Sequence, residues 1–200
     1  MSHEAMSPRE RWLAVLQRRT PDRVPMDYWA TEEATGKLLK HLGVSDAREL
    51  CDRLHIDLPV TVSPRYAGPP VPHDADVFGC RFRDVDYGTG SYRECIHHPL
   101  AGYSSVAEIA RNYRWPSPDW WDYSVIPGQL AGLERFPVRG GGSEPFLTYK
   151  NLRGDEQAFV DLVENAELAH YILGRLFDLA YEDPRRIYEA IAGQVLIDDV

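Results

Sequence analysis

The chain has 200 residues, 44% hydrophobic and 26% charged, and its 22 basic and 31 acidic side chains give a formal net charge of −9. These values are ordinary for a globular protein and exclude a disordered chain, a coiled coil and a collagen-like repeat. The acidic balance argues against nucleic-acid binding, because it repels phosphate backbones. The sequence contains no run of about 18 apolar residues, no secretory signal, and three cysteines, which make no disulfide framework. We therefore expect a cytoplasmic protein with no membrane partner.

The N-terminal third of the chain predicts alternating helices and strands. The segment Ser7-Pro8-Arg9-Glu10 is a capping box with proline at the first helical position. Thr31 and Ser45 are expected to begin two further helices. Strands are predicted at Val24–Trp29 and Ile56–Val62, which are short apolar runs. This order of elements favours a parallel α/β sheet.

The middle of the chain predicts a β-hairpin, in which Asp76–Asp86 and Ser91–His97 flank a turn at Tyr87–Gly90. Parallel barrels rarely carry such a hairpin in their wall. We therefore expect residues 76–98 to be a peripheral insertion.

The remaining elements are predicted to be mainly helical. Helices are expected up to Ile109, from Asp119 to Leu133, from Glu156 to Val163, along the stripe Leu168–Leu179 and again from Asp183-Pro184, with strands at Phe136–Arg139 and Val195–Ile197. A buried parallel strand needs a neighbour on each side, and none follows Val195–Ile197. We therefore expect the N-terminal part of a longer protein, whose apolar strand edges promote aggregation in isolation; assembly with a second chain is the alternative.

Six short motifs follow one another along the chain. They are Ser7-Pro8-Arg9-Glu10-Arg11, Pro21-Asp22-Arg23-Val24-Pro25, Phe78-Gly79, His98-Pro99-Leu100-Ala101, Trp115-Pro116 and Leu152-Arg153-Gly154. In this order and spacing the chain resembles the uroporphyrinogen decarboxylase superfamily over nearly its whole length. The resemblance implies a (β/α)8 TIM-type barrel, of which residues 1–200 are the N-terminal portion with the inserted hairpin. It also implies a ligand at the C-terminal mouth of the strands.

The resemblance implies either decarboxylation in haem biosynthesis or methyl transfer between a corrinoid and a thiol. In such methyltransferases a zinc ion, held by a His-x-Cys pair and a later cysteine, lowers the pKa of the thiol. That motif belongs to the C-terminal half of the family, so we expect no metal and no cofactor within this chain. Expected partners are a small-molecule substrate and, for methyl transfer, a corrinoid protein; the sequence leaves homo-oligomer formation open.

Polar and aromatic side chains follow the predicted strands. The candidate substrate-binding residues are Asp27, Trp29, Arg65, Tyr66, Tyr149, Arg153, Asp198 and Asp199. Carboxylates, guanidinium groups and aromatic faces at one barrel mouth suit a charged, partly flat small molecule. The alternative for each residue is a bond to a neighbouring loop.

Asp57 is the candidate catalytic residue. The segment Ile56-Asp57-Leu58 is similar to the one that carries the essential aspartate of the decarboxylase, which holds the pyrrole N–H groups of its substrate. An unpaired carboxylate inside an apolar strand costs several kcal/mol. Asp57 must therefore be paired, protonated or turned to the barrel mouth, and a purely structural partner is the alternative.

The segment Tyr28–Glu33 departs from the decarboxylase pattern, because it carries two glutamates where that enzyme has two arginines. This disfavours a substrate with eight carboxylates, although Arg65, Arg139 and Arg153 would partly compensate. We therefore favour methyl transfer or demethylation of a small methylated substrate, linked to a corrinoid. A true uroporphyrinogen decarboxylase and a non-catalytic tetrapyrrole or corrinoid binder are the alternatives.

The hairpin offers one further arrangement. If its turn centres on Gly88-Thr89, Cys80 lies opposite His97 and shares a face with Cys95, while His98 points away. The three residues could then bind a metal ion. We favour the alternative, in which the cysteines are packing residues.

Overall fold

The computed structural model describes residues 5–191. The chain divides into two compact units, each built from separate segments. Within the described residues, unit 1 comprises 5–63, 124–141 and 187–191, and unit 2 comprises 64–123 and 142–186. The predicted strand Val195–Ile197 and the candidate residues Asp198 and Asp199 lie outside the described residues. That residues 1–200 belong to one barrel, with 76–98 inserted in it, stays a prediction.

Unit 1 contains a short parallel strand pair and several helices. The elements are α1 (Pro8–Leu16), α2 (Glu32–Leu42), α3 (Ala47–Arg53), β1 (Val60–Val62), α5 (Ile126–Gln129) and β6 (Val138–Gly140). The capping box of α1 is present, because Ser7 Oγ accepts a bond from the backbone N–H of Glu10 and the Glu10 carboxylate accepts one from Ser7 N. Thr31 caps α2 as expected, whereas the cap of α3 is Asp46 and not Ser45.

Two of the predicted strands of unit 1 are shorter than expected or absent. Residues 24–29 form no strand, and a backbone bond of 2.8 Å from Asp57 N to Met26 O joins them to the segment before β1. Pro25 has no N–H to donate to a ladder. The predicted strand Ile56–Val62 is reduced to β1, which pairs in parallel with β6 in the register Thr61↔Arg139. A parallel pairing of these two segments is therefore confirmed.

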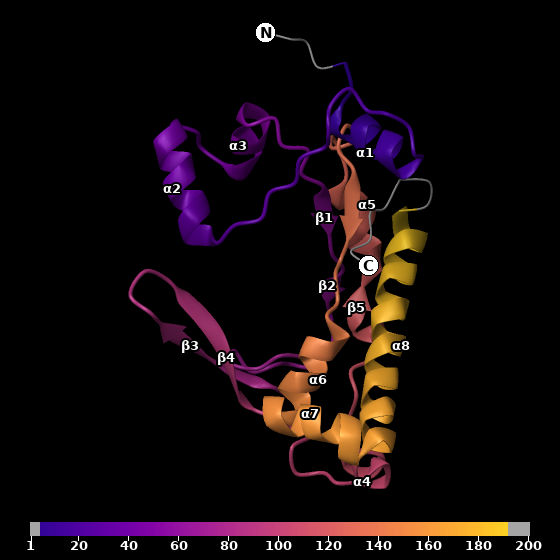
Figure 1. The fold of residues 1–200 in the computed structure, drawn as a ribbon. Helices are drawn as coiled ribbons and strands as arrows, with labels where there is room; N and C mark the ends of the chain where they lie inside the picture. Colours follow the sequence, from indigo (N-terminus) through magenta and orange to yellow (C-terminus); the bar gives the residue numbers. More distant parts are fainter. Residues whose placement is uncertain (1–4, 192–200) are drawn as a thin grey trace. The chain divides into compact units, whose positions relative to one another are not determined.

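Unit 2 is built around the hairpin and a helical layer (Figure 1). Its elements are β2 (Arg65–Tyr66), β3 (Arg81–Asp86), β4 (Ser91–His97), α4 (Val106–Asn112), β5 (Trp121–Asp122), α6 (Pro145–Arg153) and α7 (Asp155–Glu164), together with α8 (Ala166–Ile191), whose last five residues belong to unit 1. The hairpin is confirmed, but its first strand begins at Arg81. The preceding residues turn around Asp76, whose carboxylate accepts bonds from the N–H groups of Phe78 and Cys80 at 2.9 Å.

Prolines explain two differences between the predicted and observed helices. The helix expected from Asp119 to Leu133 is replaced by short pieces, because Pro118 and Pro127 each sit in the first turn of a new element. Conversely, α8 continues through Pro184 instead of restarting there. The continued helix buries Ile187 and Ile191, and this burial offsets the backbone hydrogen bond that the proline removes.

The apolar core of unit 2 joins the hairpin base to the helices. Its fully or nearly fully buried members are Cys80, Leu100, Ile109, Tyr149, Leu152, Ala158, Leu168, Ala169, Ile172 and Leu176. Among residues 5–191, three sheets are present and each has two strands: β1–β6, β2–β5 and β3–β4. The fold class of the described part is therefore mixed α/β, and a closed (β/α)8 barrel is not shown. No helix within this part is long and apolar enough to span a membrane.

Candidate functional site

The β1–β6 pair of unit 1 has one buried and one open face. Val60, Val62 and Val138 are buried, whereas Thr61 is exposed and its register partner Arg139 is partly buried. Because side chains alternate along a strand, Thr61 and Arg139 lie together on the open face. Thr61 and Arg139 are the middle residues of their strands, so this polar face runs along the side of the parallel pair.

Asp27 approaches this face from the segment before α2. Its carboxylate lies 3.2 Å from Nη2 of Arg139, and the two side chains are 44% and 23% exposed. A half-exposed ion pair of this kind stabilises the fold by about 0–1 kcal/mol. Both groups therefore remain accessible to water or to a small molecule.

Trp29 follows two residues later and is fully exposed. The neighbouring Val24 and Met26 are also exposed, at 78% and 48%. Tyr28 ties the segment to α2, because its hydroxyl lies 3.0 Å from Oγ1 of Thr35. The indole face of Trp29 is thus free to stack on a flat group or to meet a cation. Asp27 and Trp29 are therefore close along the chain, and the contact that the structure shows at this face is the one between Asp27 and Arg139.

Asp57 lies in a different environment, since it is completely buried. One carboxylate oxygen accepts bonds from Nη1 of Arg11 and Nη2 of Arg23, and the other from Nη1 of Arg23 and the backbone N–H of Met26. The backbone carbonyl of Asp57 accepts a bond of 2.9 Å from the indole N–H of Trp12. Four donors occupy the carboxylate, which is the arrangement expected for a structural partner. The catalytic role assigned to Asp57 stays a prediction.

Arg11 and Asp22 complete this buried network. The Arg11 guanidinium is inaccessible and holds both oxygens of Asp22, at 2.6 and 3.0 Å. This bidentate bond lowers the pKa of Asp22 well below its usual range and raises the pKa of Arg11. In the sequence, Arg11, Asp22 and Arg23 were noted as parts of motifs. Their alternating charges, together with an acid in the apolar segment at Asp57, were the signal that could have indicated this network.

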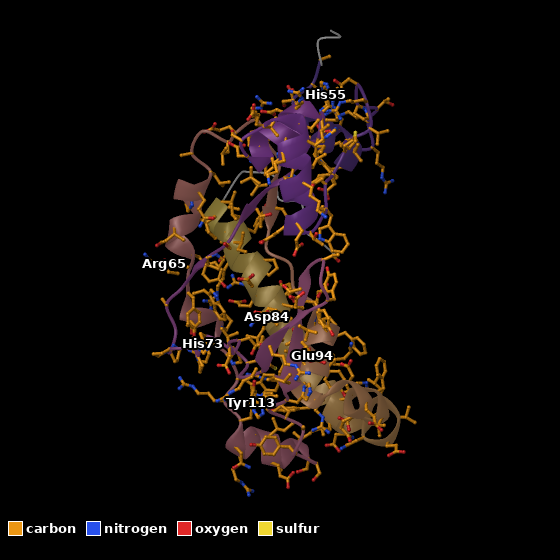
Figure 2. All side chains as sticks on the ribbon, turned by 90° about the vertical axis from the view of Figure 1, so that its left-hand side faces the viewer. His55, Arg65, His73, Asp84, Glu94 and Tyr113 are labelled. Atoms are coloured by element: carbon orange, nitrogen blue, oxygen red, sulfur yellow. The ribbon has the colours of Figure 1, made fainter. Side chains whose placement is uncertain are left out.

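The remaining described candidates belong to unit 2. Arg65, labelled in Figure 2, forms an ion pair of 2.6 Å with Asp122 on the neighbouring strand. The hydroxyl of Tyr66 donates to the carbonyl of Pro69 at 2.7 Å. These two residues lie side by side on β2, and each has a partner within the protein.

Tyr149 and Arg153 follow β6 in the chain, as expected, but they lie on α6 with their side chains in the core. The Tyr149 hydroxyl donates to the carbonyl of Ala158 at 3.1 Å, and burial raises its pKa to about 12. Arg153 pairs with the buried Asp161 at 2.6 Å and also donates to two backbone carbonyls. Both side chains connect helices to one another, and their predicted role in substrate binding is not tested.

The hairpin register differs from the one expected. Arg81, not Cys80, lies opposite His97, and a bulge separates this pair from Phe82↔Cys95. Cys95 Sγ lies 3.6 Å from Nδ1 of His98, which therefore does not point away. Within residues 5–191 no group of three or more His, Cys, Asp or Glu side chains could hold a metal ion. The register that would have joined Cys80, Cys95 and His97 around a metal ion is therefore wrong.

Comparisons with known proteins give one structural likeness. No family model matches the chain, and no curated protein matches it. A solved structure, a methyltransferase from Methanosarcina mazei, superimposes with a TM-score of 0.53 at 15% sequence identity. The match covers 96% of this chain and 58% of that protein, so the chain spans little more than half of its length. At this identity the likeness shows a shared fold.

Proposed function

We propose that the protein is an enzyme of the methyltransferase type, which binds a small methylated substrate at the open face of the β1–β6 pair. The observation that carries this proposal is the fold shared with the Methanosarcina mazei methyltransferase over 96% of the chain. The ion pair of Asp27 with Arg139 and the exposed Trp29, two residues along the chain from Asp27, support the position of the site. The resemblance to the uroporphyrinogen decarboxylase superfamily implies methyl transfer as one of two reactions.

The chemistry of these side chains suits a polarised methyl donor. A methyl group on a cationic nitrogen or sulfur carries positive charge, which the face of Trp29 and the carboxylate of Asp27 attract. Arg139, in the middle of β6, pairs with the Asp27 carboxylate at 3.2 Å and so sets the position of this charge. A corrinoid carried by a partner protein would supply the acceptor for the methyl group.

The zinc ion of the related methyltransferases finds no ligand set in the described residues, so the proposal includes no step through a metal ion. The cysteines of this part do not offer an activated thiol either, because burial raises the pKa of Cys51, Cys80 and Cys95. The described chain therefore contributes substrate binding and orientation to the proposed reaction.

Decarboxylation of a tetrapyrrole is the less suitable activity. The arginines that would compensate for the missing pair are Arg65, Arg139 and Arg153, and each forms an ion pair with an aspartate. A substrate with eight carboxylates would have to break these pairs to gain bidentate contacts. We therefore keep decarboxylation, and tetrapyrrole or corrinoid binding without catalysis, as outcomes of the test.

The test compares three probes on the purified protein. Calorimetric titration with trimethylsulfonium measures binding of a methylated cation, and absorbance follows conversion of cob(I)alamin to methylcobalamin as dimethyl sulfide is released. Uroporphyrinogen is supplied separately, with carbon dioxide release as the readout. We expect trimethylsulfonium to bind, and Trp29→Ala to abolish binding, while Tyr87→Ala, an exposed aromatic residue on the hairpin, leaves it unchanged. Carbon dioxide release, or binding of cobalamin alone, would overturn the proposal.

A further inference from the structure

Two adjoining helices of unit 2, α6 and α7, expose large apolar side chains (Figure 1). Each of these side chains is between 41% and 84% exposed: Phe146 and Leu147 on α6, and Phe159, Leu162 and Val163 on α7. The rings of Phe146 and Phe159 are in contact, with centroids 5.8 Å apart, so the apolar groups of both helices form one surface. We call these five side chains the α6–α7 patch.

The helix α7 has an apolar face beyond the one that it buries. Ala158 lies in the core of unit 2, and Asp161 is buried three positions later. Phe159, Leu162 and Val163, which are spaced by three and four positions, lie on a different face of the same helix. The largest apolar patch of a typical monomer covers about 300–600 Å² and is often functional. The α6–α7 patch therefore has the character of a binding surface.

The charges beside the patch are acidic. Glu156 in the first turn of α7 and Glu164 at its last position are both exposed, and neither has a cationic partner among residues 5–191. The basic side chains of α6 are used within the protein, because Lys150 pairs with Asp155 at 3.4 Å and Arg153 is buried in an ion pair. The patch is therefore apolar along α7 and negative at both ends of that helix.

We propose that the α6–α7 patch binds a partner protein that presents a basic amphipathic helix. The apolar side chains of that helix pack on Phe159, Leu162 and Val163, while its lysines or arginines meet Glu156 and Glu164. The net charge of −9 acts in the same direction, because it attracts a cationic partner before contact. This inference is independent of the proposed activity, since it concerns a surface of unit 2 and needs no substrate.

The shape and charge of the patch favour such a helix over other occupants. The patch stands on two helices, and the ridges of a helix pack into the grooves of another helix, whereas an added strand needs an open sheet edge. An anionic lipid surface is repelled by acidic side chains. In a symmetric contact between two copies with α7 antiparallel to its counterpart, Glu156 of one copy would lie near Glu164 of the other, and like charges repel.

The experiment measures binding of a synthetic helix by fluorescence anisotropy. The probe is a labelled peptide of about 18 residues, five helical turns, with leucine on one face and lysine on the other. Two matched peptides keep its length: one replaces every lysine by glutamate, and the other has the same composition in scrambled order. We expect the leucine–lysine helix to bind the purified protein, more weakly as salt is added. The two matched peptides should bind at least about tenfold more weakly.

Matched variants place the binding on the patch. Phe159→Ala should weaken binding of the leucine–lysine helix about tenfold, whereas Phe177→Ala, a phenylalanine on α8 that is 60% exposed, should leave it unchanged. Glu156→Gln should weaken binding and reduce its dependence on salt. Glu32→Gln, which changes an exposed glutamate in the first turn of α2, should do neither.

Several results would overturn the proposal. Failure of the leucine–lysine helix to bind would do so, and so would equal losses for Phe159→Ala and Phe177→Ala, which would indicate a general attraction to the negative charge of the protein. A dimer in analytical ultracentrifugation that Phe159→Ala dissociates would assign the patch to a second copy. Binding to vesicles of anionic lipid that is lost in Phe159→Ala would assign it to a membrane surface.

Discussion

Asp57 and Asp27 are two carboxylates of the same unit with opposite surroundings. Asp57 is fully buried and accepts four hydrogen bonds, including those from two arginines. Asp27 is 44% exposed, forms an ion pair of 3.2 Å with Arg139 and accepts a bond of 2.8 Å from the backbone N–H of Tyr28. A carboxylate has about four acceptor positions, so the protein itself uses the capacity of Asp57, whereas Asp27 retains room for a ligand.

The comparison shows that burial of a carboxylate and its availability to a ligand are different properties. Sequence reasoning singled out Asp57 because burial of an unpaired acid is costly. In the structure that cost is offset by Arg11 and Arg23, which makes Asp57 important for the fold. Asp27 contributes less to stability, and for that reason it can take part in binding.

The largest effect is expected from Asp57→Ala. The change leaves the inaccessible guanidinium of Arg11 without one of its two acidic partners, and breaking a buried pair destabilises a protein by about 3–5 kcal/mol. Asp57→Asn keeps the shape and should cost about 1–3 kcal/mol. Urea unfolding measures both, with Asp27→Asn as the matched control at about 1 kcal/mol or less. If Asp57→Asn leaves unfolding unchanged but abolishes ligand binding, Asp57 is the ligand-binding acid and the comparison is reversed.

Arg153→Met extends the comparison to unit 2. The variant leaves Asp161 buried without its arginine and removes the donor to the carbonyls of Leu100 and Tyr103. We expect a loss of about 3 kcal/mol in urea unfolding. The double variant with Asp161→Leu should recover part of this loss, because no charge then stays buried. Equal stability of the single and double variants would show that the Arg153–Asp161 pair is not the stabilising element.

Lowering the pH into the acidic range should weaken the network formed by Arg11, Asp22 and Asp57. The bond from Arg11 lowers the pKa of Asp22 in the folded protein, while the unfolded value is about 3.9. The contribution of Asp22 is therefore present above about pH 4 and is lost as the pH falls further, because the unfolded state then binds the proton more readily. Urea midpoints measured from about pH 7 to about pH 3 should fall less steeply for Asp22→Asn than for the unmodified protein. Identical slopes would exclude Asp22 as a source of acid sensitivity.

The smallest effect on stability is expected from Trp29→Ala. The indole is fully exposed, and exposed substitutions usually change the free energy of unfolding by no more than about 0.5 kcal/mol. Binding of trimethylsulfonium should nevertheless be lost, since the variant removes the aromatic face of the proposed site. A stability loss of about 2 kcal/mol or more would instead indicate that Trp29 packs against the protein in solution.

A local element could be predicted from the sequence where all the residues that stabilise it lie within one short segment. The capping box before α1, the cap at Thr31, the hairpin and α7 are of this kind, because turn residues and apolar periodicity act over a few neighbours. The parallel contact between the segments at Ile56–Val62 and Phe136–Arg139 was also within reach, since both are apolar runs. The strand predicted at Val24–Trp29 is absent, and the role of Asp27 and Trp29 in binding stays a prediction.

The partners of charged side chains were decided by the tertiary structure alone. Asp57 meets Arg11 across 46 positions of sequence, and Arg139 meets Asp27 across 112, distances over which no local pattern carries information. The hairpin register also depended on a bulge that moves each following pair by one residue. Local propensity could therefore predict where elements begin. That Asp57 is buried and Asp27 is exposed depended on how distant segments pack.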